Sequence, residues 1–203
     1  VFNAYAIDIE SGEQTALTNS EDDAHYAISW LPDSDRILVN ADQGGDELDH
    51  IYVRDESGEL YDITPGENVK AQFMGWSEDG QDIWIATNER DASAFDIYAY
   101  DTVTFEAGVA FENAEGLAIG DLSRDGRWVA MVRNNSSADS DIFLVDLSAP
   151  DAEPRLITEH DGDVAHGVYT FTPDSSALVY ATDAHGEFNQ AWTYTMADNS
   201  HAS

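Results

Sequence analysis

Short apolar runs separated by turn residues repeat along the whole chain. In each of four units an apolar strand ends in a bulky residue, a turn containing Asp follows, and a second apolar strand begins. The bulky positions recur at spacings of 46, 46 and 49 residues, at Trp30, Trp76, Leu122 and Phe171. The runs are rich in β-branched and aromatic side chains, which is typical of strands. Pro-Asp or Asp-Gly between two runs, as at Pro32-Asp33 and Asp79-Gly80, predicts a tight hairpin.

Each unit continues with a third strand and a short fourth one. An aromatic residue marks the third strand at spacings of 47, 46, 45 and 49, at Tyr5, Tyr52, Tyr98, Phe143 and Trp192. The fourth strand ends in an apolar residue followed by Thr, as at Leu17-Thr18, Ile63-Thr64 and Ile157-Thr158. Four antiparallel strands repeated every 40 to 50 residues specify a propeller blade. We therefore predict an all-β fold, a β-propeller of four-stranded antiparallel blades with about four blade repeats in a partial or open ring.

The chain begins and stops at nearly the same point of the repeat. We expect residues 3–18 to supply the third and outer strands of a first blade, and whole blades over 26–64, 72–113 and 117–158. Residues 167–196 should form a blade lacking its outer strand. An open ring exposes apolar blade faces. The chain is therefore expected to be an arc whose remaining blades lie outside this sequence; self-association through the open blade edges is the alternative closure.

The charge is strongly one-sided. The 203 residues include 41 acidic and 8 basic residues, giving a formal net charge of −33, and Lys70 is the only lysine. Acidic residues recur in nearly every loop, which indicates adaptation of the whole surface to salt; a patch that captures cations or a basic partner is the alternative. The near absence of lysine resembles the proteomes of salt-in halophiles and favours a saline cytoplasm as location.

The same composition disfavours several classes of partner. Nucleic acid is disfavoured because phosphate contacts need Lys and Arg. With no run of 18 apolar residues, no membrane span is predicted. Without cysteine, neither a disulfide framework nor a thiolate metal site can form. No phosphate-binding glycine loop occurs, and no cofactor is predicted.

No catalytic residue is predicted in this chain. The nearest approach to a Gly-x-Ser-x-Gly nucleophile elbow is Gly75-Trp76-Ser77-Glu78-Asp79, which has Asp at its last position and lies on the repeated strand–turn unit. None of the six histidines forms a ligand pair on one element.

One acidic loop offers weak candidates for calcium ligands. It places Asp42, Asp46, Glu47 and Asp49 within eight residues together with two glycines, and carboxylate oxygens suit a hard cation. The spacing does not match an EF-hand loop, so no metal site is predicted here and a solvated acidic loop is the favoured interpretation.

The repeated hairpin, in which a bulky residue is followed by an Asp-containing turn and a second apolar strand, is one part of a resemblance to known proteins. Together with the Asp-Ile-Tyr-x-x-Asp strand at 96–101, it resembles two related groups of propellers. One is the N-terminal propeller of the prolyl oligopeptidase family, including dipeptidyl and acylaminoacyl peptidases; the other is the TolB-like propeller. The first resemblance implies a non-catalytic domain that gates peptide substrate for a C-terminal hydrolase domain absent from this chain. The second implies a protein-interaction propeller. Asp46 and Glu47 resemble the paired acids that hold a peptide amino group in dipeptidyl peptidases, although their flanking residues do not match.

Overall fold

The computed structural model describes residues 1–32, 34–149 and 152–203, which form one two-stranded and four four-stranded antiparallel sheets. The half blade contains β1 (Tyr5–Ile7) and β2 (Gln14–Ala16). Blade I contains β3 (Tyr26–Trp30), β4 (Ile37–Ala41), β5 (His50–Arg54) and β6 (Leu60–Asp62). Blade II contains β7 (Ala71–Trp76), β8 (Asp82–Asp91), β9 (Ala94–Asp101) and β10 (Ala107–Phe111), and blade III contains β11 (Ala118–Leu122), β12 (Trp128–Ser136), β13 (Asp139–Asp146) and β14 (Arg155–Leu156). Blade IV contains β15 (His166–Phe171), β16 (Ala177–Thr182), β17 (Gln190–Thr195) and β18 (Ser200–Ala202). The predicted fold class is confirmed.

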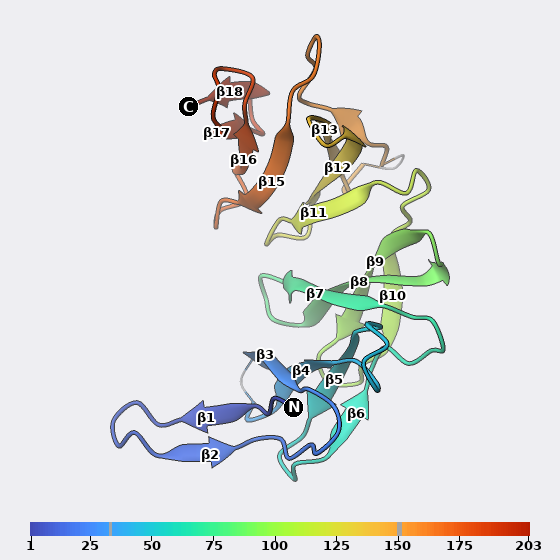
Figure 1. Ribbon diagram of the computed structural model, residues 1–203, viewed down its shortest axis with the longest axis vertical. Coiled ribbons are helices and arrows are strands. Elements are labelled where there is room, and N and C mark those ends of the chain that lie inside the picture. The colour runs from blue at the N-terminus through green and yellow to red at the C-terminus, as the bar shows by residue number, and fades with distance from the viewer. Residues whose placement is uncertain (33, 150–151) are drawn as a thin grey trace.

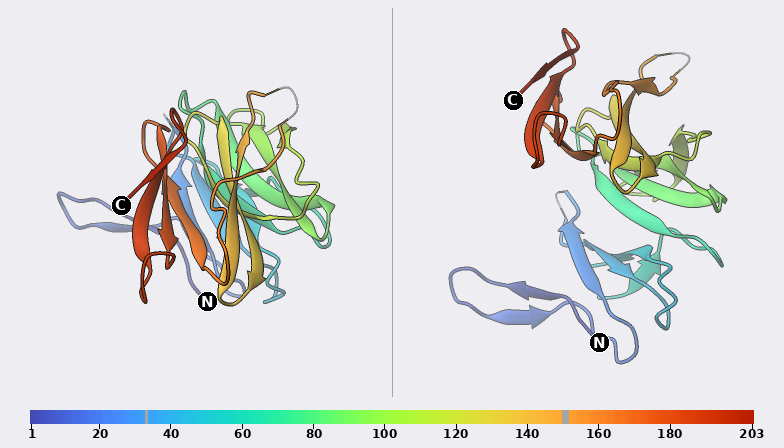
Figure 2. Two further views of the ribbon diagram at one scale, coloured as in Figure 1. Left: turned by 90° about the horizontal axis from the view of Figure 1, so that it is seen from above. Right: turned by 45° about the horizontal axis from the view of Figure 1, so that its top comes forward.

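The blades follow one another along an open arc (Figure 1). In each blade the strands pair in sequence order, and Figure 1 shows the first strand of each blade toward the inner side of the arc. The right-hand view of Figure 2 shows the same open arc. The half blade stands at one end, where Tyr5 and Ile7 are 57% and 58% exposed. In the part of the chain that the structure describes, no helix is long and apolar enough to cross a membrane.

The hydrophobic cores lie between consecutive blades. Between blades III and IV, for example, Ile142 and Leu144 pack against Leu178 and Tyr194, all four being almost completely buried. Equivalent clusters join the half blade to blade I, blade I to blade II and blade II to blade III. The middle strands of a blade are therefore apolar on both faces, which explains why their sequences are continuous apolar runs and do not alternate.

Every inner strand carries a β-bulge at the same place. The register shifts once in each of β3, β7, β11 and β15, two residues before the repeated bulky residue. A bulge bends its strand and increases the local twist. In β11 the bulged residue is Gly120, and a Cβ there would lie 2.7 Å from Val168 of β15. The close approach of these two inner strands therefore requires glycine.

The repeated Thr of the outer strand has a structural role. Its hydroxyl accepts a hydrogen bond from the backbone N–H at the start of the third strand, at 2.9 Å from Ala4 to Thr18, 2.9 Å from Ile51 to Thr64 and 2.8 Å from Ile142 to Thr158. The repeat thus records a buried polar contact, in which an otherwise unpaired donor is satisfied.

The predicted lack of an outer strand in the last blade is wrong. Residues Ser200–Ala202 form β18, which pairs with β17. The chain reverses through Asn199, whose φ is 55°, while the Asp198 carboxylate accepts hydrogen bonds from the backbone N–H and hydroxyl of Ser200. This strand escaped prediction because it lacks the apolar-Thr ending that marks the outer strand in the half blade and in blades I and III.

Candidate functional site

The arc has two faces, which we name from the connections that they carry. Consecutive strands are antiparallel, so the connections from first to second strand and from third to fourth strand share one face, the turn face. The connections from second to third strand, and from one blade to the next, share the opposite face, the loop face.

The predicted acidic loop joins β4 to β5 on the loop face. Its carboxylates bind its own backbone: Asp42 accepts from the N–H of Glu47 at 3.2 Å, and Asp46 accepts from the N–H of Leu48 at 3.0 Å. Glu47 has a φ of 61°, and its carbonyl oxygen accepts a hydrogen bond from Lys70 Nζ at 2.9 Å.

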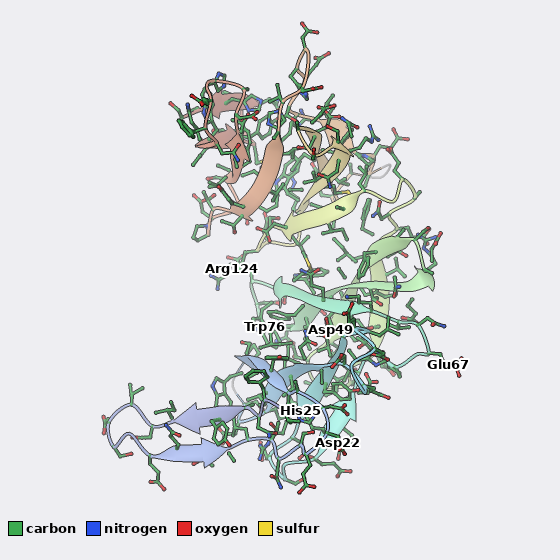
Figure 3. All side chains as sticks on the ribbon, in the orientation of Figure 1. Asp22, His25, Asp49, Glu67, Trp76 and Arg124 are labelled. Atoms are coloured by element: carbon green, nitrogen blue, oxygen red, sulfur yellow. The ribbon has the colours of Figure 1, made fainter. Side chains whose placement is uncertain are left out.

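The calcium candidates are not gathered into a metal-binding group. Asp49, labelled in Figure 3, lies directly before β5, and its carbonyl oxygen accepts from the N–H of Ala71 in the next blade. Among the described residues, no group of three or more His, Asp or Glu side chains is placed to hold a metal ion. The suggestion that Asp46 and Glu47 hold a peptide amino group stays a prediction.

The hydroxyl of the elbow-like segment belongs to a hairpin on the turn face. Ser77 Oγ donates to Asp79 at 2.8 Å and accepts from the N–H of Asp82 at 2.9 Å. Ser123 and Thr172 make the same pair of hydrogen bonds in blades III and IV. The hydroxyls at this repeated position therefore close turns. In blade I the predicted turn includes Asp33, which lies outside the described residues.

A groove of about 490 Å³ lies across the inner-strand ends of blades II, III and IV on the turn face. Its walls include Trp76, Trp84, Asp121, Leu122, Arg124 and Phe171. Figure 3 shows Arg124 and Trp76 toward the inner side of the arc. The mixture of aromatic rings and a guanidinium makes this groove our candidate binding site in the described part of the chain.

The aromatic wall is positioned by a turn glycine. Gly126 has a φ of 69°, and a Cβ there would lie 2.7 Å from Cζ2 of Trp84. Only glycine tolerates both this backbone conformation and this contact. The indole of Trp84 therefore packs directly on the β11–β12 turn, which carries Arg124. This turn is thereby fixed against the aromatic wall.

Sequence reasoning missed Arg124, although a signal for it exists. The residue two positions after the repeated bulky residue is Pro32, Glu78, Arg124 or Pro173 in the four repeats. Proline and glutamate are ordinary residues of an exposed turn, so Arg124 differs from its counterparts only when the four repeats are aligned. The alignment alone places it in a turn; the structure adds the aromatic neighbours.

Three histidines gather between blades III and IV. The rings of His160 and His166 lie 5.1 Å apart, and His201 Nδ1 lies 2.8 Å from Tyr180 Oη. Hydrogen bonding to the Thr158 carbonyl, followed by the Asp139 carboxylate, raises the pKa of His160, whereas burial lowers the pKa of His166 and of His201. The sequence showed no His pair on a single element; His160 lies in the connection from blade III to blade IV, whereas His166 and His201 lie on β15 and β18 of blade IV.

No protein-family model and no curated protein matches this sequence. Solved structures do resemble it. TolB from Acinetobacter baumannii matches with a TM-score of 0.60 at 19% identity, over 98% of this chain and 47% of TolB. A structure of prolyl endopeptidases matches with a TM-score of 0.67 at 15% identity, over 97% of this chain and 31% of that one. An oligogalacturonate lyase in complex with manganese matches with a TM-score of 0.68 at 18% identity, over 95% and 53%.

These similarities establish the fold. The resemblance to TolB and prolyl oligopeptidase propellers is confirmed at that level, and the chain spans between 31% and 53% of the length of these proteins. A peptidase, a lyase and TolB share the architecture, so the architecture alone does not select an activity.

Proposed function

We propose that this chain is the non-catalytic propeller of a serine peptidase of the prolyl oligopeptidase family, where it gates and helps to bind peptide substrate. The observation that carries the proposal is the match of 97% of the chain to 31% of a prolyl endopeptidase. In those enzymes, inter-domain dynamics has a role in catalysis and specificity. A domain beside the catalytic one can control access by such motion.

The chemistry of the chain agrees with a gating role. The repeated hydroxyls of Ser77, Ser123 and Thr172 are bound within hairpins. The groove lies on the inner side of the arc, where the inner strands of a closed ring surround the central passage. A ligand that enters by this passage meets the groove.

The complete reading frame tests the proposal. We expect a hydrolase segment after residue 203, with Gly-x-Ser-x-Gly followed by Asp and His. The whole protein should hydrolyse short peptides and reject folded proteins, and a Ser→Ala change at the elbow should abolish hydrolysis. The proposal is overturned if no elbow follows or if the whole protein shows no such activity.

The alternative is a TolB-like propeller that binds a protein partner. The TM-score of 0.60 to TolB over 98% of this chain supports it. A reading frame that encodes only a propeller, together with a stable complex between the purified protein and one defined partner, would replace the peptidase proposal by this one.

A further inference from the structure

Arg124 differs from the other basic residues of the chain. Seven of the eight Lys and Arg side chains donate a hydrogen bond to a protein group, and three of these seven, Arg90, Arg127 and Arg133, bind carboxylates. In the described part of the chain, Arg124 has no hydrogen bond, ion pair or aromatic partner. In a chain of net charge −33, a free guanidinium is the exception, and its position in the groove calls for a ligand.

The one carboxylate that lines the groove is already occupied. Asp121 accepts from the N–H of Leu122 at 2.9 Å and from the N–H of Phe171 at 2.8 Å, so it holds blade III to blade IV. Asp125, next to Arg124 in the turn, accepts from Ser123 Oγ at 2.5 Å and from the N–H of Arg127 at 3.1 Å. Both acids are committed to backbone and turn contacts, and the guanidinium donors remain available.

Large apolar side chains form most of the remaining lining, together with the hydroxyl residues Ser123, Thr170 and Thr172. Trp76 and Trp84 form one wall, and Leu122 and Phe171 contribute the other side. Salt screens a simple charge attraction over a few ångströms at molar concentration. The planar guanidinium still forms paired hydrogen bonds with a carboxylate, and apolar contacts persist in salt. A ligand suited to this groove therefore joins a carboxylate to an apolar side chain.

We propose that Arg124 and the aromatic walls of this groove form a subsite for a peptide carboxylate next to an apolar side chain. The proposal deepens the peptide-binding function and rests on it for the choice of a peptide ligand. A carboxylate of this kind is supplied either by the C-terminus of a peptide or by an Asp or Glu side chain, and the experiment separates these two sources.

Binding of three acetylated probe peptides to the complete protein in molar KCl tests the subsite by calorimetry. One ends in leucine with a free carboxylate, the second is its amide, and the third is an amide that carries Asp beside leucine. We expect at least one of the two carboxylate peptides to bind about tenfold more tightly than the neutral amide, as for loss of one charge-assisted pair. The stronger of the two carboxylate peptides identifies the source.

Variants make the test specific. Arg124→Gln should bring all three peptides to the affinity of the neutral amide. Arg124→Lys should retain part of the preference for a carboxylate peptide, because lysine keeps the charge but cannot form the paired hydrogen bonds of a guanidinium. Arg133→Gln is the matched control, since Arg133 is exposed on blade III and pairs with Glu115 outside the groove; it should leave the preference unchanged.

Three outcomes would overturn the subsite: equal binding of acid and amide, a preference that survives Arg124→Gln, or no binding of any peptide at millimolar concentration. Thermal unfolding of Arg124→Gln provides the folding check, and it should be unchanged because the side chain is exposed and unpaired. These outcomes are independent of whether a hydrolase segment follows residue 203, so failure of the subsite and failure of the peptidase proposal are distinguishable.

Discussion

The turn face and the loop face are built from the same blades but hold their connections differently. On the turn face, eight aspartates in the described residues each accept hydrogen bonds from groups of their own turn: Asp8, Asp55, Asp79, Asp101, Asp125, Asp146, Asp174 and Asp198. On the loop face the connections vary, from two residues between β8 and β9 to the nine residues 17–25 between β2 and β3.

This contrast separates two sources of the acidic composition. Turn-face aspartates belong to the local structure, because a short carboxylate can accept N–H and hydroxyl donors within a turn. Those hydrogen bonds lower the pKa of Asp101, mainly through the N–H of Thr104, and of Asp174, mainly through the Thr172 hydroxyl. Some loop-face acids also accept hydrogen bonds within their loop, as Asp91 does from Ser93, whereas the exposed loop-face Asp22 accepts none among the described residues. The repeat therefore explains part of the charge, and adaptation to salt is our proposal for the remainder.

The largest expected effect is that of salt on the whole fold. Only three carboxylate–guanidinium pairs are present among the described residues, against a net charge of −33. Repulsion on both faces should therefore destabilise the fold at low ionic strength. We expect the thermal unfolding midpoint to rise steadily between about 0.1 M and about 2 M KCl. A flat or falling midpoint would contradict salt adaptation.

The next largest effect should come from the ion pair between the buried Asp96 and the partly exposed Arg90 at the loop-face end of blade II. Asp96 is fully buried and accepts from Arg90 Nε at 2.5 Å, from Arg90 Nη2 at 2.8 Å and from the N–H of Asn113 at 2.7 Å. Asp96→Ala breaks the pair with Arg90 and leaves the buried N–H of Asn113 without an acceptor, so we expect a loss of about 3 kcal/mol in the free energy of unfolding. Denaturant unfolding in molar salt measures it.

The matched control is the exposed pair at the turn-face end of blade III. Arg127 binds Asp146 at 2.7 and 3.0 Å, but their side chains are 48% and 26% exposed. Asp146→Ala should cost less than about 1 kcal/mol, because water replaces the lost contact. Equal losses for the two variants would show that burial does not distinguish the pairs.

Much of the fold was predictable because its determinants are local and repeated. Tight turns require particular residues, and strands packed between two blades require continuous apolar runs, so both leave a periodic pattern in the sequence. The bulky residues of the inner strands and the Thr of the outer strands are examples. The first recurs in all four blades, and the second recurs in the half blade and in blades I and III.

The groove was not predictable because its members come from three blades and only one of them departs from the repeat. Trp76 and Phe171 appear in the sequence as ordinary core residues, and Arg124 as a turn residue. The three histidines are likewise brought together only in the folded chain, by pairing of the strands of blade IV and by the connection that leads into it. A periodic pattern identifies what the units share, whereas a binding site depends on where they differ.

The smallest expected effect concerns one turn-face carboxylate in acid. The Thr172 hydroxyl, with the Ser176 hydroxyl and N–H, lowers the pKa of Asp174 from 3.8 to about 2. Because the folded state depresses this pKa, the contribution of the charged group to stability is present above pH 3.8 and is lost as the pH falls through about 2. Asp174→Asn retains an acceptor and removes the charge. Its unfolding midpoint should therefore lie below that of the unmodified protein at neutral pH and converge with it near pH 2.

Asp22→Asn on the loop face is the matched control for this comparison. The side chain of Asp22 is exposed and lies in the connection from β2 to β3. Removing one negative charge there relieves repulsion without breaking a turn, so the midpoint at neutral pH should stay equal or rise slightly. Thermal unfolding of both variants between pH 7 and about pH 2, in molar KCl to limit repulsion, measures the difference. If both substitutions changed stability alike at every pH, the turn-face carboxylates would be surface charges like those of the loop face, and the distinction between the two faces would have no energetic basis.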